Sequence, residues 1–165
     1  MDLIVPPLGP ALYRGRAIPC AIGRGGLTGA KKEGDGGTPR GAWRIESGFW
    51  RADRLARPST AVPMVPSGPR MGWCDAPGHP DYNQQVRLPF EASHERMRRG
   101  DRLYDVVLVL DHNRHPPVPG AGSAIFVHCW RGPRRPTEGC IAFARPDLLW
   151  ILERWDMSRD RVVVR

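Results

Sequence analysis

The stretch that decides the fold of this chain consists of residues 125–128, which read IFVH, and residues 137–141, which read TEGCI. An apolar run such as the first is typical of a buried β-strand. The spacing predicts a strand that ends at His128, an excursion rich in Pro and Arg, and a return that places Cys140 beside the imidazole. Gly139 has no Cβ, so a substrate carbonyl can approach the backbone closely there.

Cys140 and His128 form a candidate nucleophile and base. A cysteine attacks as the thiolate, and a neighbouring imidazole is the commonest means of forming a thiolate at neutral pH. The pair therefore favours acyl transfer by a thiol of low pKa. The alternative is a buried structural cysteine beside a histidine whose hydrogen bonds are satisfied, and the spacing alone leaves both interpretations open.

Length and composition predict one mainly β domain over residues 1–165. The 19 glycines and 18 prolines lie scattered among apolar residues, which indicates many turns between short strands. Strands are expected within residues 2–22, at 42–45, at 106–110 and at 161–165, and a surface loop is expected over 51–70. One helix is predicted over 147–155, where Pro146 and Asp147 are typical of a helix start, and a short one over 91–99.

The net charge of +8 and the isoelectric point near 10.2 indicate anionic partners. No block of Lys and Arg with interleaved aromatic residues occurs, so a nucleic-acid partner is not expected. The four cysteines form no CxxC pair, which argues against a disulfide framework and a zinc site. We expect no metal and no cofactor.

The first residues, MDLIVPP, lack the basic start and the long apolar run of a signal peptide. No segment of the sequence is apolar over the length that a membrane span needs, so stable membrane insertion is not expected. We therefore expect a cytoplasmic protein, or a periplasmic one if an export signal has been removed. The sequence does not indicate the oligomeric state.

Several spaced motifs resemble the catalytic domain of the L,D-transpeptidase (YkuD-like) family, in its compact single-domain branch. The resemblance covers nearly the whole chain and implies a β-rich, sandwich-like fold with one or two short helices. The motifs are KKEGDGGTPRGAW (31–43), GWCDAP (72–77), YNQQV (82–86), YDVVLVLDHN (104–113), GSAIFVH (122–128) and PTEGCIAF (136–143).

The resemblance implies roles for four residues. Cys140 matches the nucleophile, His128 the base, and Thr137 the family's Ser or Thr before x-Gly-Cys. The backbone N–H groups of Gly139 and Cys140 would help to form the oxyanion hole. Many members carry an arginine two residues after the cysteine, but this chain has Ala142.

Substrate recognition then needs other residues. Arginines in the loop between His128 and Cys140 are candidates to replace the missing arginine. The backbone N–H of Glu138, in the turn before Cys140, is a further candidate hydrogen-bond donor. Trp73, together with Tyr82 and Asn83 in the motif that follows, is a candidate for the wall of the cleft. Core packing is the alternative for Trp73. These substrate-binding candidates are Arg131, Arg134, Arg135, Glu138, Trp73, Tyr82 and Asn83. A backbone carbonyl, as in the family, or a carboxylate such as Asp75 or Asp111 would orient the imidazole.

The family implies cleavage of the bond between an L-centre and a D-centre in peptidoglycan stem peptides. We expect a cytoplasmic L,D-carboxypeptidase that removes D-alanine from tetrapeptides of recycled muropeptides. One alternative is a periplasmic L,D-transpeptidase that forms cross-links. The alternative of another class is a basic nucleic-acid or glycan-binding module in which Cys140 is only structural.

Overall fold

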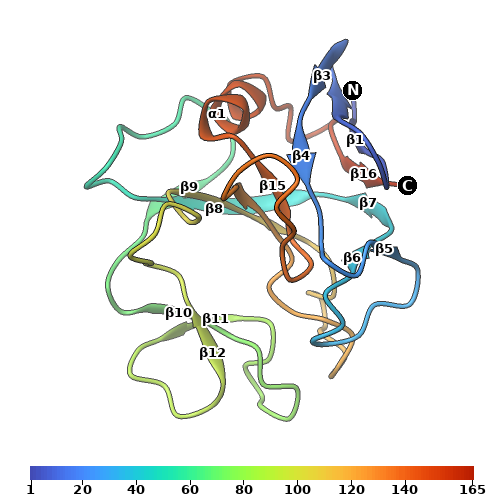
Figure 1. The fold of residues 1–165 in the computed structure, drawn as a ribbon. Helices are drawn as coiled ribbons and strands as arrows, with labels where there is room; N and C mark the ends of the chain where they lie inside the picture. The colour runs from blue at the N-terminus through green and yellow to red at the C-terminus, as the bar shows by residue number, and fades with distance from the viewer.

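Short β-strands make up most of the regular structure, as predicted. The structure is a computed structural model that describes residues 1–165. It contains four sheets and one helix (Figure 1). The helix has nine residues, so no helix is long enough to cross a membrane.

A six-stranded sheet forms the centre of the molecule. Its inner strand β13 is the apolar run VVLVL, and all five of its residues are buried, because both faces of the sheet are covered. In spatial order the strands are β4 (Cys20–Ala21), β15 (Ile141–Phe143), β14 (Phe126–Cys129), β13 (Val106–Leu110), β8 (Ile45–Trp50) and β9 (Met64–Pro66).

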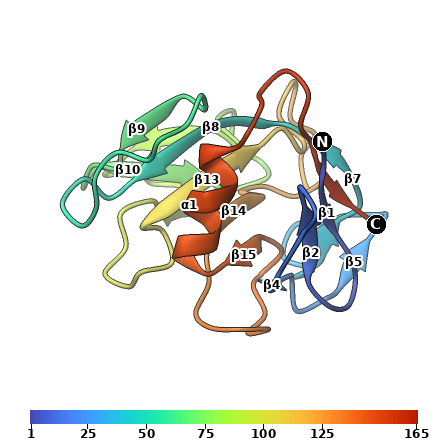
Figure 2. The ribbon, with the colours of Figure 1, turned by 90° about the horizontal axis from the view of Figure 1, so that it is seen from above.

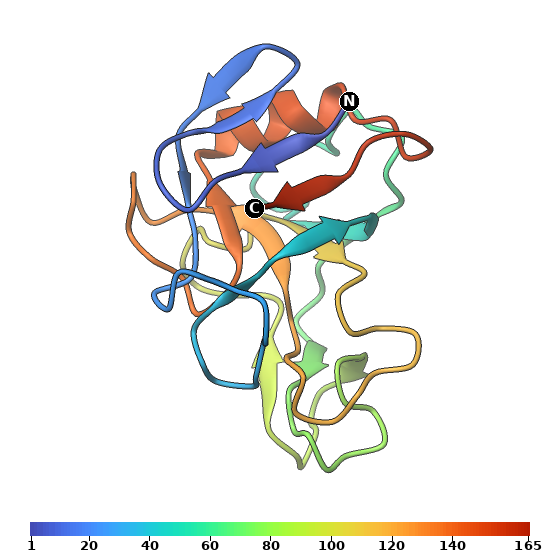
Figure 3. The same cartoon turned by 90° about the vertical axis from the view of Figure 1, so that its right-hand side faces the viewer.

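A five-stranded sheet joins the two ends of the chain. The first strand pairs in parallel with the last, so both termini lie on this sheet (Figure 3). In spatial order its strands are β3 (Arg16–Ile18), β2 (Ala11–Tyr13), β1 (Leu3–Val5), β16 (Val162–Val164) and β7 (Gly41–Trp43). The strands expected in residues 2–22 and 161–165 are thus present, and the one at 42–45 is divided at Arg44 between β7 and β8.

Two smaller sheets complete the fold. One pairs β5 (Leu27–Thr28) with β6 (Thr38–Pro39), and it holds the loop that carries the KKEGDGG motif. The other orders β11 (Gln85–Arg87), β10 (Met71–Cys74) and β12 (His94–Arg96), and it lies on the side of the central sheet opposite the helix (Figure 1).

Helix α1 (Arg145–Glu153) confirms the helix expected at 147–155, with its first residue two positions earlier. Pro146 lies in the first turn, where its missing N–H costs no hydrogen bond. Leu148, Ile151 and Leu152 are buried on the face that packs against the central sheet. Figure 2 shows from above how the helix lies across the strands of this sheet.

The central sheet separates two apolar clusters, because alternate residues of a strand point to opposite faces. On β13, Val106 and Leu108 belong to the large cluster beneath α1, whereas Val107 and Val109 belong to a smaller cluster on the other face. The smaller cluster also contains Cys140, so the candidate nucleophile lies on the side of the sheet away from the helix.

The short helix predicted over residues 91–99 is wrong. Residues 94–96 form β12, which pairs antiparallel with β10, with Glu95 opposite Trp73. Met97 follows, and it is fully buried in the smaller cluster. Pairing with a distant strand and burial of Met97 outweigh the weak helix propensity of this segment.

The surface loop predicted over 51–70 is only partly correct. Residues 64–66 form β9, which pairs in parallel with β8, and Val62 is buried in the large cluster. Arg51 is also buried, because its guanidinium donates to Asp53 and to the carbonyl oxygen of Arg99. The high arginine and proline content of residues 51–70 predicted a surface loop, but part of this segment is a strand and part is buried.

Candidate active site

Cys140 lies in the turn immediately before β15. Strands β14 and β15 run in parallel with Val127 opposite Ile141, so Cys140 lies beside Phe126 on the face away from the helix. The Phe126 N–H lies 3.4 Å from Cys140 Sγ, and Sγ lies 3.2 Å from the carbonyl oxygen of Ala124. The residue is 9% exposed, so its thiol reaches solvent only through the cavity described below.

His128 lies on β14, two residues beyond Phe126, and its side chain is on the same sheet face as Cys140. Its Nδ1 lies 2.8 Å from the carbonyl oxygen of Cys129. A carbonyl only accepts hydrogen bonds, so Nδ1 carries the hydrogen and the lone pair is on Nε2. The ring of Tyr104 packs edge-on against the imidazole, with 5.2 Å between centroids.

Neither carboxylate considered for orienting His128 does so. Asp111 accepts the N–H of Arg44, and Asp75 lines the cavity without a hydrogen bond to the imidazole. The Cys129 carbonyl oxygen takes this role, which agrees with the backbone alternative.

Burial favours the neutral forms of both groups. It raises the pKa of the Cys140 thiol to about 12, and the carboxylate of Glu95 adds to the increase. Burial likewise lowers the pKa of His128 to about 4. The expected thiolate of low pKa is therefore wrong for the resting enzyme: thiol and imidazole are both neutral, and the proton must move when the nucleophile attacks.

The turn of residues 137–140 orients the backbone around the thiol. The Thr137 hydroxyl donates to the Cys140 carbonyl oxygen at 2.6 Å and accepts the Gly139 N–H at 3.2 Å. The Gly139 N–H is therefore already engaged, whereas the Cys140 N–H makes no hydrogen bond within the chain. Of the two donors that the resemblance implies for an oxyanion, Cys140 N–H is the free one.

Gly139 needs to be glycine for two reasons. Its φ is +135°, a region that side chains disfavour, and a Cβ there would lie 2.9 Å from the Gly37 carbonyl oxygen.

We expect Gly139→Ala to displace Cys140 and to lower kcat/KM by about 10²-fold, the scale of a 1 Å misplacement. The matched control is Gly29→Ala, where no atom lies within 4 Å of the added Cβ. Steady-state kinetics on a stem peptide measure both variants, and a fully active Gly139→Ala protein would contradict this account of the turn.

A partly buried ion pair between Lys31 and Asp35 lies behind the same turn. Lys31 Nζ donates to the carboxylate of Asp35 and, at 3.0 Å, to the Lys32 carbonyl oxygen, and its side chain is only 5% exposed. The same Nζ lies 3.5 Å from the position that a Cβ on Gly139 would occupy. Its charge acts to lower the pKa of Cys140.

Lys31→Met is expected to shift alkylation of Cys140 to higher pH, by about one pKa unit, because a positive charge near the thiolate is lost. The control is Lys32→Met, which removes the exposed neighbouring charge. Rates of iodoacetamide labelling between pH 6 and 10 measure the shift. Identical profiles for the two variants would show that Lys31 acts only on the structure of the loop.

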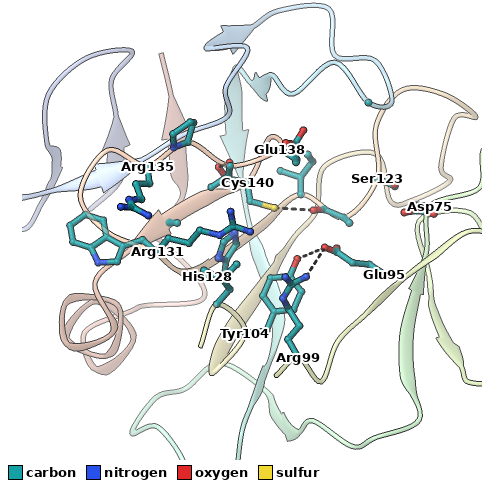
Figure 4. A pocket seen from close by; sticks show the side chains of 18 of the residues that line it. Asp75, Glu95, Arg99, Tyr104, Ser123, His128, Arg131, Arg135, Glu138 and Cys140 are labelled. Atoms are coloured by element: carbon teal, nitrogen blue, oxygen red, sulfur yellow. Dashed lines mark hydrogen bonds and ion pairs between the residues drawn. The ribbon is translucent and has the colours of Figure 1, made fainter. Parts of the chain in front are cut away.

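A cavity of about 340 Å³ opens above the thiol. It is lined by six of the residues predicted from the sequence, and Figure 4 labels all of them except Thr137, together with side chains that the sequence did not indicate. The six are Cys140, His128, Thr137, Glu138, Arg131 and Arg135.

Trp73, Tyr82 and Asn83 are buried and do not line this cavity, so the structure does not support their prediction as cleft residues. Trp73 is 2% exposed and packs against Phe126, which fits the alternative of core packing. Trp73 Nε1 donates to Asn83 Oδ1 at 3.0 Å, and the Tyr82 hydroxyl donates to Glu33. These side chains hold the segments behind the cavity wall together.

The arginines of the loop divide into two groups. Arg131 and Arg135 line the cavity, whereas Arg134 is exposed outside it, so its prediction as a substrate contact is not supported. Ala142, at the position of the family's arginine, lies directly opposite His128 and also lines the cavity.

The sequence analysis missed several cavity residues, among them Tyr104, Glu95 and Arg99. The Tyr104 hydroxyl donates to Glu95 at 2.7 Å, and Arg99 lies over the Tyr104 ring at 5.1 Å and 3.9 Å from the Glu95 carboxylate. Glu95 and Arg99 fall in the segment mistaken for a helix. No spacing in the sequence links them to Cys140.

Comparison with known families decides the identity of the domain. The family model for the L,D-transpeptidase catalytic domain (YkuD) matches residues 12–164 of the 165 residues. The chain belongs to the L,D-transpeptidase catalytic domain family. Comparisons with curated proteins and with solved structures give no significant match.

Membership of the L,D-transpeptidase family confirms the resemblance found in the sequence. It identifies a cysteine acyl-transferase that acts on peptidoglycan stem peptides. It thereby favours acyl transfer over the basic binding module. The roles of individual residues stay predictions, which the experiments below address.

Proposed function

We propose that this L,D-transpeptidase-family enzyme is an L,D-carboxypeptidase that releases the terminal D-alanine of stem tetrapeptides to water. The observation that carries the proposal is a cavity of about 340 Å³ that is lined by both the thiol and the imidazole, which lie on the same face of the sheet.

The first half-reaction uses the neutral pair directly. As Sγ of Cys140 bonds to the substrate carbonyl carbon, its proton passes to Nε2 of His128, which is unprotonated at neutral pH. The N–H of Cys140 is placed to donate to the developing oxyanion. The carbon–nitrogen bond then breaks, the leaving amine takes the proton from Nε2, and a thioester remains on Cys140.

In the second half-reaction, water is the acceptor of the acyl group. A water molecule gives its proton to Nε2 of His128 and its oxygen to the acyl carbon, the carbon–sulfur bond breaks, and Sγ recovers the proton. An amine competes with water only when binding raises its effective concentration. The cavity is near the lower end of the size range of small-molecule sites, and an acceptor peptide would have to share it with the acylated stem.

Two arginines that line the cavity are suited to bind the carboxylate of the leaving residue. Arg131 and Arg135 line the cavity and have no hydrogen bond or ion pair to an acidic side chain of the chain. Guanidinium groups pair with carboxylates through two parallel hydrogen bonds. These arginines are therefore our candidates to replace the arginine absent at position 142.

The test is digestion of a purified tetrapeptide muropeptide in H₂¹⁸O, followed by mass spectrometry. Hydrolysis yields a tripeptide that carries one ¹⁸O atom in its new carboxylate, and Cys140→Ala protein yields none. An added D-amino acid and excess stem peptide serve as competing acceptors. Cross-linked dimers or D-amino-acid exchange in excess of the labelled tripeptide would refute hydrolysis and favour the transpeptidase.

The proposal also places the reaction in the cytoplasm, where soluble fragments of peptidoglycan return for recycling. The periplasm is the alternative. Fractionation of cells that express the tagged full-length gene product distinguishes the two, and the enzyme in the osmotic-shock fluid would contradict the cytoplasmic assignment.

A further inference from the structure

The five-stranded sheet that joins the two ends of the chain has one covered face and one uncovered face. Alternate residues of its strands point to opposite faces. One set belongs to the large apolar cluster, namely Leu3, Val5, Ala11, Tyr13, Ile18, Val162 and Val164. The other set is exposed or half-buried and forms the outer face of the sheet. Figure 3 shows the sheet from this side, with β1 and β16 in front of helix α1.

An apolar row crosses all five strands of this outer face. The pairing register places Ala17 opposite Leu12 and Leu12 opposite Ile4. It then places Ile4 beside Val163 and Val163 opposite Ala42. Leu12 is 52% exposed. Single exposed apolar side chains are common on soluble proteins, but a continuous row on one face is typical of an interaction surface.

Two pairs of arginines border the apolar row. On β16 and the residues next to it, Arg161 and Arg165 each lie two positions from the member of the row, so they point to the same face. Arg40 and Arg44 flank β7 in the same way. The two strands are antiparallel, and one further step of their register places Arg161 opposite Arg44. At the other end of the row, Arg165 falls opposite Arg40.

No acidic side chain forms an ion pair with these four arginines. Only Arg161 uses its guanidinium in a hydrogen bond within the chain, to the carbonyl oxygen of Asp160. Asp2 and Asp111 lie near the row, but they accept the backbone N–H groups of Arg161 and Arg44. Like charges that lie opposite each other destabilise a sheet, so the facing arginines indicate an anionic partner.

The segment between β1 and β2 adds an apolar side chain beside one of the arginine pairs. Leu8 is 88% exposed and is the most exposed large apolar residue of the chain. The N–H of Arg165 donates to the carbonyl oxygen of Val5, the last residue before this segment. Apolar side chains and cations are therefore presented together at this end of the row.

We infer that the outer face of the five-stranded sheet docks on the surface of a lipid bilayer that contains anionic phospholipids. The apolar row and Leu8 enter the interfacial layer, and the arginine pairs bind lipid phosphates. Docking of this kind is peripheral. None of the residues of the face lines the cavity above Cys140, so the surface is separate from the active site.

The charges and the residue types of the face favour a bilayer over other anionic or apolar partners. A second copy of the chain would bring the same positive surface against itself, which like-charge repulsion opposes. Single-stranded nucleic acid binds by stacking its bases on aromatic side chains, and the row contains none. An anionic bilayer combines negative charge with an apolar interior, as the face requires.

The test is co-sedimentation of the 165-residue protein with vesicles of phosphatidylcholine alone, or of equal parts of phosphatidylcholine and phosphatidylglycerol. The protein is expected to bind the mixed vesicles at least about tenfold more tightly, and high salt should weaken that preference. The double variant Arg44→Gln/Arg165→Gln should weaken binding by about 10–30-fold, or about fivefold for each arginine. Its matched control is Arg57→Gln/Arg87→Gln, which removes the same charge from exposed residues outside this sheet.

A second pair of variants tests the apolar row. Leu12→Ser is expected to weaken binding by about tenfold, because the leucine no longer buries apolar area in the interface. The matched control is Val65→Ser on β9, where the side chain is 50% exposed but lies outside the row. All four variants should hydrolyse a soluble stem peptide at the wild-type rate and keep the wild-type circular dichroism spectrum, so a loss of vesicle binding reports on the surface alone.

Four results would each overturn the inference. The first is equal binding to both kinds of vesicle, and the second is an equal loss of binding in the two double arginine variants. The third is a loss in Arg44→Gln/Arg165→Gln with none in Leu12→Ser, which would indicate a site for any polyanion, such as nucleic acid. The fourth is a dimer in sedimentation velocity that Leu12→Ser dissociates, which would make a second copy of the chain the occupant.

Discussion

Cys140→Ala is expected to lower turnover of stem peptides by about 10⁴-fold or more, because no other group in the cavity can form the thioester. The fold should persist. The substitution removes one sulfur atom from the smaller apolar cluster, where Cys140 has no partner but the backbone of Phe126 and Ala124. Product formation by mass spectrometry measures the loss, and an unchanged far-UV circular dichroism spectrum, dominated by β-structure, shows that the domain is folded.

Cys129→Ala is the matched control for this prediction. Cys129 lies one residue after His128, but its side chain points to the opposite sheet face, into the cluster beneath the helix. Burial raises its pKa to about 11, and the cavity does not reach it. Cys129→Ala should keep most of the activity. If Cys129 is essential and Cys140 dispensable, the assignment of the nucleophile is wrong.

The parts of the fold that could be predicted are those determined by local patterns. Residues 106–110 are apolar at every position, and such a run is compatible with a strand buried on both faces. The helix of residues 145–153 combines a proline in its first turn with one apolar face. Each signal lies within about ten residues, so no knowledge of tertiary contacts is needed to recognise it.

The segment of residues 91–99 shows where local patterns fail. Its strand forms because β10, some twenty residues earlier, offers an edge opposite Trp73. The pairing also carries Glu95 into the cavity and Met97 into the core. Only the tertiary structure determines these contacts, so neither the strand nor the position of Glu95 in the cavity could be predicted from the sequence.

The candidate site divides in the same way. Cys140 and His128 were found because their motifs are local and two parallel neighbouring strands bring them together. Trp73 was misplaced because its motif is adjacent to the site in space, but its ring turns into the core toward Phe126. The raised pKa of the Cys140 thiol could not be predicted either, because burial raises it and burial is a property of the folded chain.

His128→Gln is expected to lower kcat/KM at neutral pH by about 10²–10⁴-fold, the range for a positioned acid–base group. Glutamine can occupy the space of the ring, but its amide cannot take the thiol proton. The reaction then depends on the small fraction of Cys140 already ionised. The pKa of about 12 makes that fraction very small at pH 7.

The pH dependence tests this mechanism more sharply than the rate alone. His128 is unprotonated above its pKa of about 4, so the wild-type kcat/KM should be nearly constant between pH 6 and 9. In His128→Gln it should rise about tenfold per pH unit over the same range, because the thiolate fraction does so below its pKa. Alkylation of Cys140 should likewise shift to higher pH. His79→Gln, outside the cavity, should retain the wild-type profile. A flat profile in His128→Gln would mean that the imidazole does not accept the proton of Cys140.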